Sequence, residues 1–247
     1  MASDPTKLAI IRAFDAAAAT YDAASKVQRE IARELLLYAA RACERTPARI
    51  LDLGCGAGHA TEFALRQWPQ AQFAVLDAAP KMLEALQGKF SGLATICADA
   101  AEPGPLGEYD VILSSMMAHW LPEPRAAVRV WRDLLAPGGK CFIALPVEGS
   151  LHEWRDACRE AGLADGLWPF PPENFAAGLT EKTEIRAFVA SYPDAGAFLQ
   201  SLKRTGARQA RPGHRPESPA ALRRLMASRR EGFIATFRIA FLTIGAE

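Results

Sequence analysis

The sequence has no long apolar run, no cysteine framework and no excess of charge of one sign, and each absence excludes a class of protein. No apolar stretch approaches the roughly 18 residues of a membrane-spanning helix, and charges throughout the first thirty residues argue against a secretion signal. The five cysteines stand singly, without the spacing of metal ligands, and their odd number would leave one unpaired in a secreted protein. We therefore expect a soluble cytoplasmic protein with free thiols and no metal site.

Charge and length bound the organisation of the chain further. The formal net charge of +1 argues against a dedicated DNA-binding protein. With 247 residues, half of them hydrophobic, the chain can bury one large core or a core with a small subdomain. No internal repeat, low-complexity tract or long linker divides it, so we expect one domain over residues 1–247.

Short apolar segments alternate with helical ones through the middle of the chain. We expect strands at 48–53, 72–76, 94–97, 109–114 and 140–145, and helices at 61–68, 80–90 and 124–135. Strands that alternate with helices predict an α/β fold with a doubly wound, mostly parallel sheet.

The two ends of the chain follow other patterns. Apolar residues recur at helical spacing in the segments 7–21, 25–42, 151–161 and 196–204. The sheet is expected to resume only in the β-branched segment 232–244. Residues 146–230 would then form an insertion before the last strand.

Three alternating glycines, Gly54, Gly56 and Gly58, follow the first predicted strand, where the chain must turn into a helix. Without side chains there, the backbone can approach a ligand closely. A dinucleotide-binding loop would require a further glycine where His59 stands. The preceding acid, Asp52, instead suits a cofactor that carries an amino group and no phosphate.

Two more acids end the next two strands. Asp77 lies nineteen residues beyond Gly58, where a carboxylate can accept hydrogen bonds from both hydroxyls of a ribose, and Asp99 follows the third strand. The carboxyl ends of parallel strands share one edge of a sheet, so these acids and Asp52 are expected to face one crevice. Taken singly, each acid is also compatible with a plain helix cap, and the glycines with a tight turn.

The glycine loop and the acids resemble those of the class I S-adenosylmethionine-dependent methyltransferases, over about residues 48–145. Six segments, all but 114–120 outside this core, are similar to the malonyl-ACP O-methyltransferases, which open the pimelate branch of biotin synthesis: 14–22, 27–30, 114–120, 148–151, 170–173 and 201–207. The resemblance implies a Rossmann-like sheet of seven strands. It also implies an N-terminal helical lid (1–45), a cofactor-binding core (46–145), a substrate cap (146–230) and a closing strand (231–247).

The resemblance further implies S-adenosyl-L-methionine as the cofactor, with its adenine ring beside Asp99 and Ala100. The residues expected to bind it are Asp52, Gly54, Gly56, Gly58, Asp77, Ala78, Met82, Asp99, Ala100 and Ser115. Some positions depart from the family: Ser115 replaces a frequent asparagine, His119 a frequent glutamine, and Ala78 or Ala79 a serine or threonine. These departures keep related carboxylate methyltransferases, such as those acting on trans-aconitate, open as alternatives.

The implied acceptor is the free carboxylate of a malonyl thioester. It is ionised at neutral pH and needs no general base, so the expected work of the protein is to align the reactants and exclude water. Tyr21 on the N-terminal helix is expected to close the site, and His119 and Trp120, after the fourth strand, to wall an acyl pocket. Ordinary core or loop packing is the alternative for all three side chains.

An anionic acceptor calls for a cation, for which we select Lys203, Arg204 and Arg208. Further basic residues follow at Arg211, Arg215, Arg223, Arg224, Arg229 and Arg230, against the single acid Glu217. Such a surface could dock an acidic acyl carrier protein carrying the malonyl group, or could be a solvated helix face. Nucleic-acid binding ranks lower, because no aromatic residues are interleaved for base stacking.

Three functions therefore stay open. The first is esterification of malonyl-ACP, or of malonyl-CoA, at the start of biotin synthesis. The second is the same chemistry on another small carboxylate such as trans-aconitate. The third is an inactive cofactor-binding interaction protein, because one methyltransferase core serves many acceptors and fold analogy never fixes the substrate.

Overall fold

The computed structural model describes residues 4–211, 213–229 and 231–246. Within them, seven strands form one sheet in the order β3-β2-β1-β4-β5-β7-β6. The strands are β1 (Arg49–Leu53), β2 (Gln72–Asp77), β3 (Ala94–Cys97), β4 (Tyr109–Ser115), β5 (Leu135–Pro146), β6 (Lys182–Tyr192) and β7 (Phe233–Gly245). Strands β1 to β5 are parallel, whereas β7 runs antiparallel to both β5 and β6. The predicted doubly wound, mostly parallel α/β fold is confirmed.

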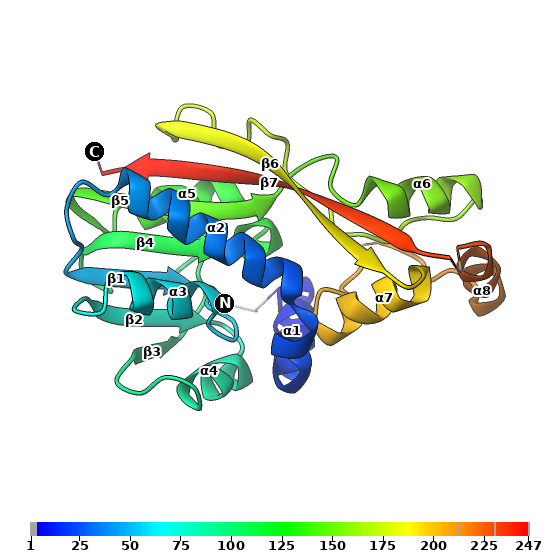
Figure 1. Cartoon of the computed structure of the whole chain (residues 1–247), viewed down its shortest axis with the longest axis horizontal. Coiled ribbons are helices and arrows are strands. Elements are labelled where there is room, and N and C mark those ends of the chain that lie inside the picture. Colours follow the sequence, from blue (N-terminus) through cyan, green and yellow to red (C-terminus); the bar gives the residue numbers. More distant parts are fainter. Residues whose placement is uncertain (1–3, 212, 230, 247) are drawn as a thin grey trace.

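Helices cover both faces of this sheet (Figure 1). They are α1 (Pro5–Ala24), α2 (Lys26–Ala42), α3 (His59–Gln67), α4 (Pro80–Gln87), the 3-10 turn η1 (Ala118–Trp120), α5 (Pro124–Arg132), α6 (His152–Glu160), α7 (Ala195–Arg204) and α8 (Pro219–Ser228). Successive side chains of a strand point to opposite faces. Accordingly Ile50 packs in the core with α2, and Leu51 packs in the other core with Trp131 of α5. None of the described helices is long and apolar enough to cross a membrane.

The first two helices take the predicted positions, with Ser25 at the joint between them. Helix α1 does not lie on the sheet but packs against α4 and α7, beyond the carboxyl ends of the first strands (Figure 1). It buries Ile10, Ala13 and Ala17. The helix therefore forms a wall at the sheet edge to which the predicted functional acids belong.

One prediction was wrong: residues 146–230 are not an uninterrupted insertion, because they contain β6. This strand pairs with β7 along its whole length, from Lys182 opposite Thr243 to Tyr192 opposite Phe233. It forms the edge of the sheet and leaves Val189 60% exposed. A half-exposed edge strand needs few apolar residues, so its sequence carries only a weak strand pattern. Two segments, one on each side of β6, therefore take the place of the single predicted insertion.

Candidate functional site

A cleft of about 970 Å³ lies at the carboxyl ends of β1, β2 and β4, and we call it the strand-end cleft. The acids Asp52, Asp77 and Asp99, which come from three separate strands or the loops after them, all line it. Six other residues predicted to bind a cofactor also line it: Gly54, Gly56, Ala78, Met82, Ala100 and Ser115. One predicted residue does not. Helix α1 closes the cleft on the side away from the sheet.

The exception is Gly58, which begins α3 with a φ of +88° and faces Leu86 and Phe90 rather than the cleft. Its role is helix packing. Gly54, with a φ of +69°, packs so closely on Met117 that an added Cβ would lie 2.1 Å from that side chain. A Cβ on Gly56 would meet no atom within 4 Å. The loop backbone at Gly56 is therefore bare toward the space that a ligand would fill.

Asp52 gives the clearest indication of the kind of ligand that the cleft could bind. Its side chain is 1% exposed, and its Oδ2 accepts a hydrogen bond of 2.6 Å from the Thr61 hydroxyl. Its Oδ1 is buried and has no hydrogen-bond partner. Burial, opposed by the Thr61 hydrogen bond, raises the pKa of Asp52 to about 7. Because buried acceptors are rarely left unpaired, this oxygen fits a donor supplied by a ligand, such as an ammonium group.

The carboxylate of Asp77 is held by the backbone. Its Oδ2 accepts from the Gly56 amide and its Oδ1 from the Ala79 amide, each at 2.8 Å. Burial raises the pKa of Asp77, and the backbone hydrogen bonds oppose that rise. Each carboxylate oxygen has a second lone pair, so the fixed group can still accept from the two hydroxyls of a ribose.

Asp99 is held less tightly. Its Oδ1 accepts from the Ala101 amide at 3.0 Å, and its Oδ2 forms an ion pair with Lys7 of α1. Sequence reasoning missed Lys7, together with Ile10, Ile11 and Phe14, which line the same cleft. The amphipathic pattern of 7–21 predicted a buried face, but nothing in that pattern tells which element the face covers.

A second cavity adjoins the first, and we call it the aromatic cavity. Tyr21 and Trp120 line both spaces. Trp120 packs against Trp168 with ring centroids 5.6 Å apart, and Phe14 packs edge-on against Trp120 at 5.5 Å. His119 lines only the aromatic cavity. Apolar surface thus surrounds one side of Tyr21, and the acids of the cleft lie on the other.

Two titratable side chains of this region are held in their neutral forms. Burial raises the pKa of Tyr21, and the negative charge of Asp77 adds to the effect. Burial lowers the pKa of His119 to about 3, and its Nδ1 has no hydrogen-bond partner. Its backbone oxygen accepts a hydrogen bond of 2.9 Å from the indole of Trp168. Neither Tyr21 nor His119 therefore carries a charge at neutral pH.

The three predicted cations do not lie in these spaces. Lys203 and Arg204 are exposed in the last turn of α7 and line neither the cleft nor the aromatic cavity. Helix α7 buries Phe198 instead, so its basic residues fall on the solvent side. Arg208 lines a separate hollow farther out. No Lys or Arg within the described ranges lines the aromatic cavity.

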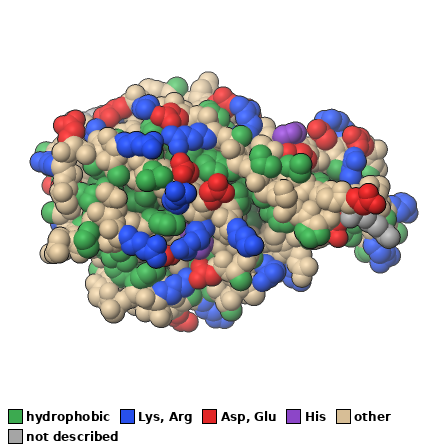
Figure 2. Space-filling model, viewed as in Figure 1, with side chains coloured by type: hydrophobic (Ala, Val, Ile, Leu, Met, Phe, Trp, Pro, Cys, Tyr) green, Lys and Arg blue, Asp and Glu red, His purple; other side chains and the backbone are tan. Residues whose placement is uncertain are grey.

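The remaining basic residues are on the surface. Arg211, Arg215, Arg223 and Arg224 are exposed, and Arg229 pairs with Glu160. Arg230 lies outside the described residues. Figure 2 shows basic side chains at the α8 end of the molecule, among others spread over the visible face. A basic surface is therefore present, but it lies outside the two spaces that adjoin Tyr21.

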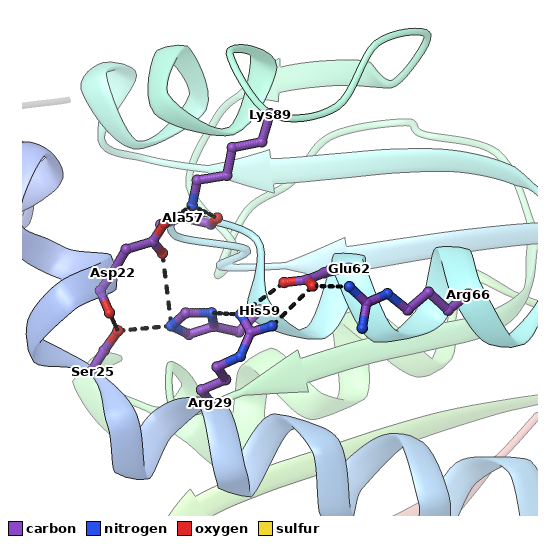
Figure 3. Close-up of polar contacts among 8 residues, drawn as sticks. All are labelled: Asp22, Ser25, Arg29, Ala57, His59, Glu62, Arg66 and Lys89. Carbon is purple, nitrogen blue, oxygen red and sulfur yellow. Dashed lines mark hydrogen bonds and ion pairs between the residues drawn. The ribbon is translucent and has the colours of Figure 1, made fainter.

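A polar network ties the joint of α1 and α2 to the glycine loop (Figure 3). At its centre the Ser25 hydroxyl lies 2.7 Å from Nε2 of His59, the first residue of α3. Arg29 points a guanidinium nitrogen at Nδ1 of His59 from 3.4 Å, so Nδ1 acts as the acceptor and Nε2 carries the proton. Burial lowers the pKa of His59 to about 4, and the positive charges of Arg29 and Lys89 oppose protonation further.

Ion pairs surround this central contact. Asp22 at the end of α1 pairs with Lys89, whose ammonium also donates to the Ala57 carbonyl at 2.9 Å. Arg29 of α2 binds both oxygens of Glu62 of α3, at 2.9 and 2.7 Å. This hydrogen bond is the main cause that lowers the pKa of Glu62. The wall that carries Tyr21 is therefore fastened to the loop that lines the cleft.

A family model described as a methyltransferase domain matches residues 23–181. This chain belongs to the methyltransferases. It is 31% identical over 233 residues to a malonyl-[acyl-carrier protein] O-methyltransferase of Halorhodospira halophila, covering 89% of this chain and 78% of that protein. It is 32% identical to the biotin biosynthesis bifunctional protein BioCD of Bordetella avium over 94% of this chain, and spans about half (51%) of the length of that relative.

Two further matches concern a shorter part of the sequence and the fold. A trans-aconitate 2-methyltransferase of Mycobacterium tuberculosis is 36% identical over 104 residues, which are 42% of this chain and 38% of that protein. Among solved structures, the plantazolicin methyltransferase BpumL in complex with SAH has a TM-score of 0.53 at 16% identity, covering 99% of this chain and 92% of that one. The predicted class I fold and the S-adenosylmethionine cofactor are confirmed.

Proposed function

We propose that this methyltransferase esterifies the free carboxylate of a malonyl group carried on an acyl carrier protein, the first step of pimelate formation for biotin. The observation that carries the proposal is the pair of adjoining spaces that share Tyr21. The polar strand-end cleft suits the cofactor, and the apolar aromatic cavity suits a thioester-linked acyl group. Similarity to relatives named for malonyl-[acyl-carrier protein] over most of this chain supports it.

On the cofactor side, the structure fits S-adenosylmethionine. The unpaired Oδ1 of Asp52 would accept from its ammonium group, and the fixed carboxylate of Asp77 would accept from its ribose hydroxyls. Asp99 lies where it would accept from the adenine amine. When bound, the cofactor would supply a methyl group attached to a positively charged sulfur. A carboxylate oxygen can attack the methyl carbon, and the electron pair of the broken carbon–sulfur bond stays on the sulfur.

On the acceptor side, the chain needs no general base, because a malonyl carboxylate is already ionised at neutral pH. Tyr21 and His119 fit this requirement, since both are held neutral and neither is suited to take up a proton. Their work is to donate hydrogen bonds or to pack, while Trp120 and the wall of α1 keep water from the nucleophile. Alignment and desolvation would supply the rate enhancement.

Lys203 and Arg204 take a different place in this proposal from the one expected from sequence. Being exposed, they would not hold the carboxylate but would attract the acidic carrier protein, together with the arginines of α8. Attraction of this kind raises the association rate and weakens with salt. The expected signature is a KM for the carrier substrate that rises with ionic strength, while the affinity for the cofactor stays constant.

The test is methyl transfer from labelled S-adenosylmethionine to malonyl-ACP, with malonyl-CoA, free malonate and trans-aconitate assayed in parallel. Esterification of malonyl-ACP, and less efficiently of malonyl-CoA, is expected, with no transfer to free malonate or trans-aconitate. Transfer to trans-aconitate alone would replace the proposed substrate by a small free acid. Binding of the cofactor without transfer to any of the four would favour an inactive interaction protein.

A further inference from the structure

A third space continues the series that begins with the strand-end cleft. This outer hollow, of about 800 Å³, lies between the end of α7, the start of α8 and the segment around residue 166. Leu167, Leu202 and Ala207 line both the outer hollow and the aromatic cavity, so the two spaces adjoin at these side chains. Tyr21 and Trp120 join the aromatic cavity to the strand-end cleft in the same way. The three spaces therefore lie in one row that leads outward from Tyr21.

The chemical character changes along this row. The aromatic cavity, in the middle of the row, has no Asp, Glu, Lys or Arg among the described residues that line it. His119, the titratable ring in its wall, is held neutral by burial, which lowers its pKa. The outer hollow has two basic residues, Arg208 and His214, and two acids, Asp165 and Glu217. A neutral passage thus leads from an outer charged mouth to the reaction site.

The two acids of the outer hollow are already engaged by the backbone. Asp165 Oδ1 accepts from the Leu167 amide at 2.7 Å, and Glu217 Oε1 accepts from the Ala164 amide at 2.9 Å. No ion pair joins Arg208 to an acid in the part of the chain that the structure describes. The guanidinium of Arg208 is therefore available to an anion from outside.

We infer that this row of spaces holds the prosthetic arm on which a carrier protein presents its acyl group, with the phosphate of the arm at Arg208 and His214. The inference rests on the proposed function. A folded carrier cannot enter the aromatic cavity, so its acyl group must arrive on a long, uncharged pantetheine chain that ends in a phosphate. The row offers a matching order of groups: Arg208 for the phosphate at the mouth, an uncharged lining for the amides of the chain, and the space beside Tyr21 for the malonyl carboxylate.

Passage of the arm requires Leu167, Leu202 and Ala207 to part. They are small or flexible side chains, and all three are half-buried. Leu202 and Ala207 lie near the end of α7, and Leu167 lies in the segment rich in proline and aromatic residues. Enlarging Ala207 to Phe should block this passage without touching the strand-end cleft, which Ala207 does not line.

The decisive experiment compares Arg208→Ala with the matched control Arg211→Ala, an exposed arginine that does not line the outer hollow. Both variants are assayed with malonyl-CoA, which carries the phosphate, and with malonyl-pantetheine, which lacks it. Arg208→Ala should raise the KM for malonyl-CoA on the order of tenfold, as expected for loss of a charge-assisted hydrogen bond, and leave that for malonyl-pantetheine unchanged. Arg211→Ala should alter neither.

Calorimetric binding of free coenzyme A to the same proteins supplies a readout that does not depend on turnover. It should weaken in Arg208→Ala and not in Arg211→Ala. Equal effects of the two variants, or an equal rise in KM for both substrates, would show that Arg208 makes no specific phosphate contact and would overturn the inference. If the native protein methylates no malonyl thioester, the proposed function fails, and the coenzyme A measurement still decides whether Arg208 binds the phosphate.

Discussion

Affinity for S-adenosylmethionine should depend on pH through a single buried carboxylate, that of Asp52. The ammonium group of the cofactor requires the ionised form, and burial raises the pKa of Asp52 to about 7 in the free protein. At pH 5 only about 1% of the protein then has this carboxylate ionised. The apparent affinity scales with that fraction, so binding should be roughly 100-fold weaker at pH 5 than at about pH 8.

Isothermal titration of the cofactor between pH 5 and pH 9 measures this dependence. The apparent Kd should fall about tenfold per unit as the pH rises from 5 to 7, and should rise again above about pH 8, where the ammonium group of the cofactor loses its own proton. Asp52→Asn keeps the shape of the side chain and cannot ionise, so its Kd should be weaker at pH 8 and should lose the slope. Asp77→Asn is the companion variant, because the pKa of Asp77 is also raised. A full slope in Asp52→Asn would refute the reasoning.

The same carboxylate should lower the stability of the cofactor-free protein. Its pKa rises from about 3.8 to about 7 on folding, so between these values the folded state binds more protons than the unfolded state. The free energy of unfolding therefore falls as pH rises through this window, by at most about 4 kcal/mol. Urea denaturation at pH 5 and pH 8 should show about 3 kcal/mol of this change, because the two measurements span about two units of the window. In Asp52→Asn, the free energies of unfolding at the two pH values should differ less than in the native protein. An equal difference in both proteins would contradict the assignment of this pH dependence to Asp52.

Two further predictions concern the elements around the cleft. Ser25→Ala leaves the buried Nε2–H of His59 without its acceptor and should cost about 1–3 kcal/mol of unfolding free energy, whereas Arg66→Ala, which removes an exposed pair with the same network, should cost less than about 1 kcal/mol. Equal losses by urea denaturation would contradict a central role for this contact. Gly54→Ala places a Cβ against Met117 and should abolish measurable cofactor binding in a calorimetric titration; retained affinity would show that the loop yields cheaply.

Much of the sheet could be predicted from the sequence because its inner strands are buried on both faces. Ile50 to Leu53 of β1 are all buried and, apart from Asp52, all apolar, and such a buried run that stops at a glycine is typical of an inner strand. The acids stand out against these runs, since Asp77 ends the second strand and Asp52 lies one residue before the end of the first. Edge strand β6 could not be predicted in this way, because few of its side chains are buried. Its antiparallel hydrogen bonds to β7 hold it in the sheet instead.

Sequence reasoning also selected basic residues for the acceptor side but could not place them. Lys203, Arg204 and Arg208 lie within six residues of one another, yet only Arg208 lines a hollow, because the chain leaves α7 between them. This change of direction decides whether a basic side chain lies in a hollow or on the outer surface. No local pattern in the sequence predicts it. The aromatic cavity shows the complementary point: its uncharged lining arises only when residues far apart in the sequence pack together. A neutral cavity is therefore recognisable from the fold, whereas the basic residues near it are already visible in the sequence.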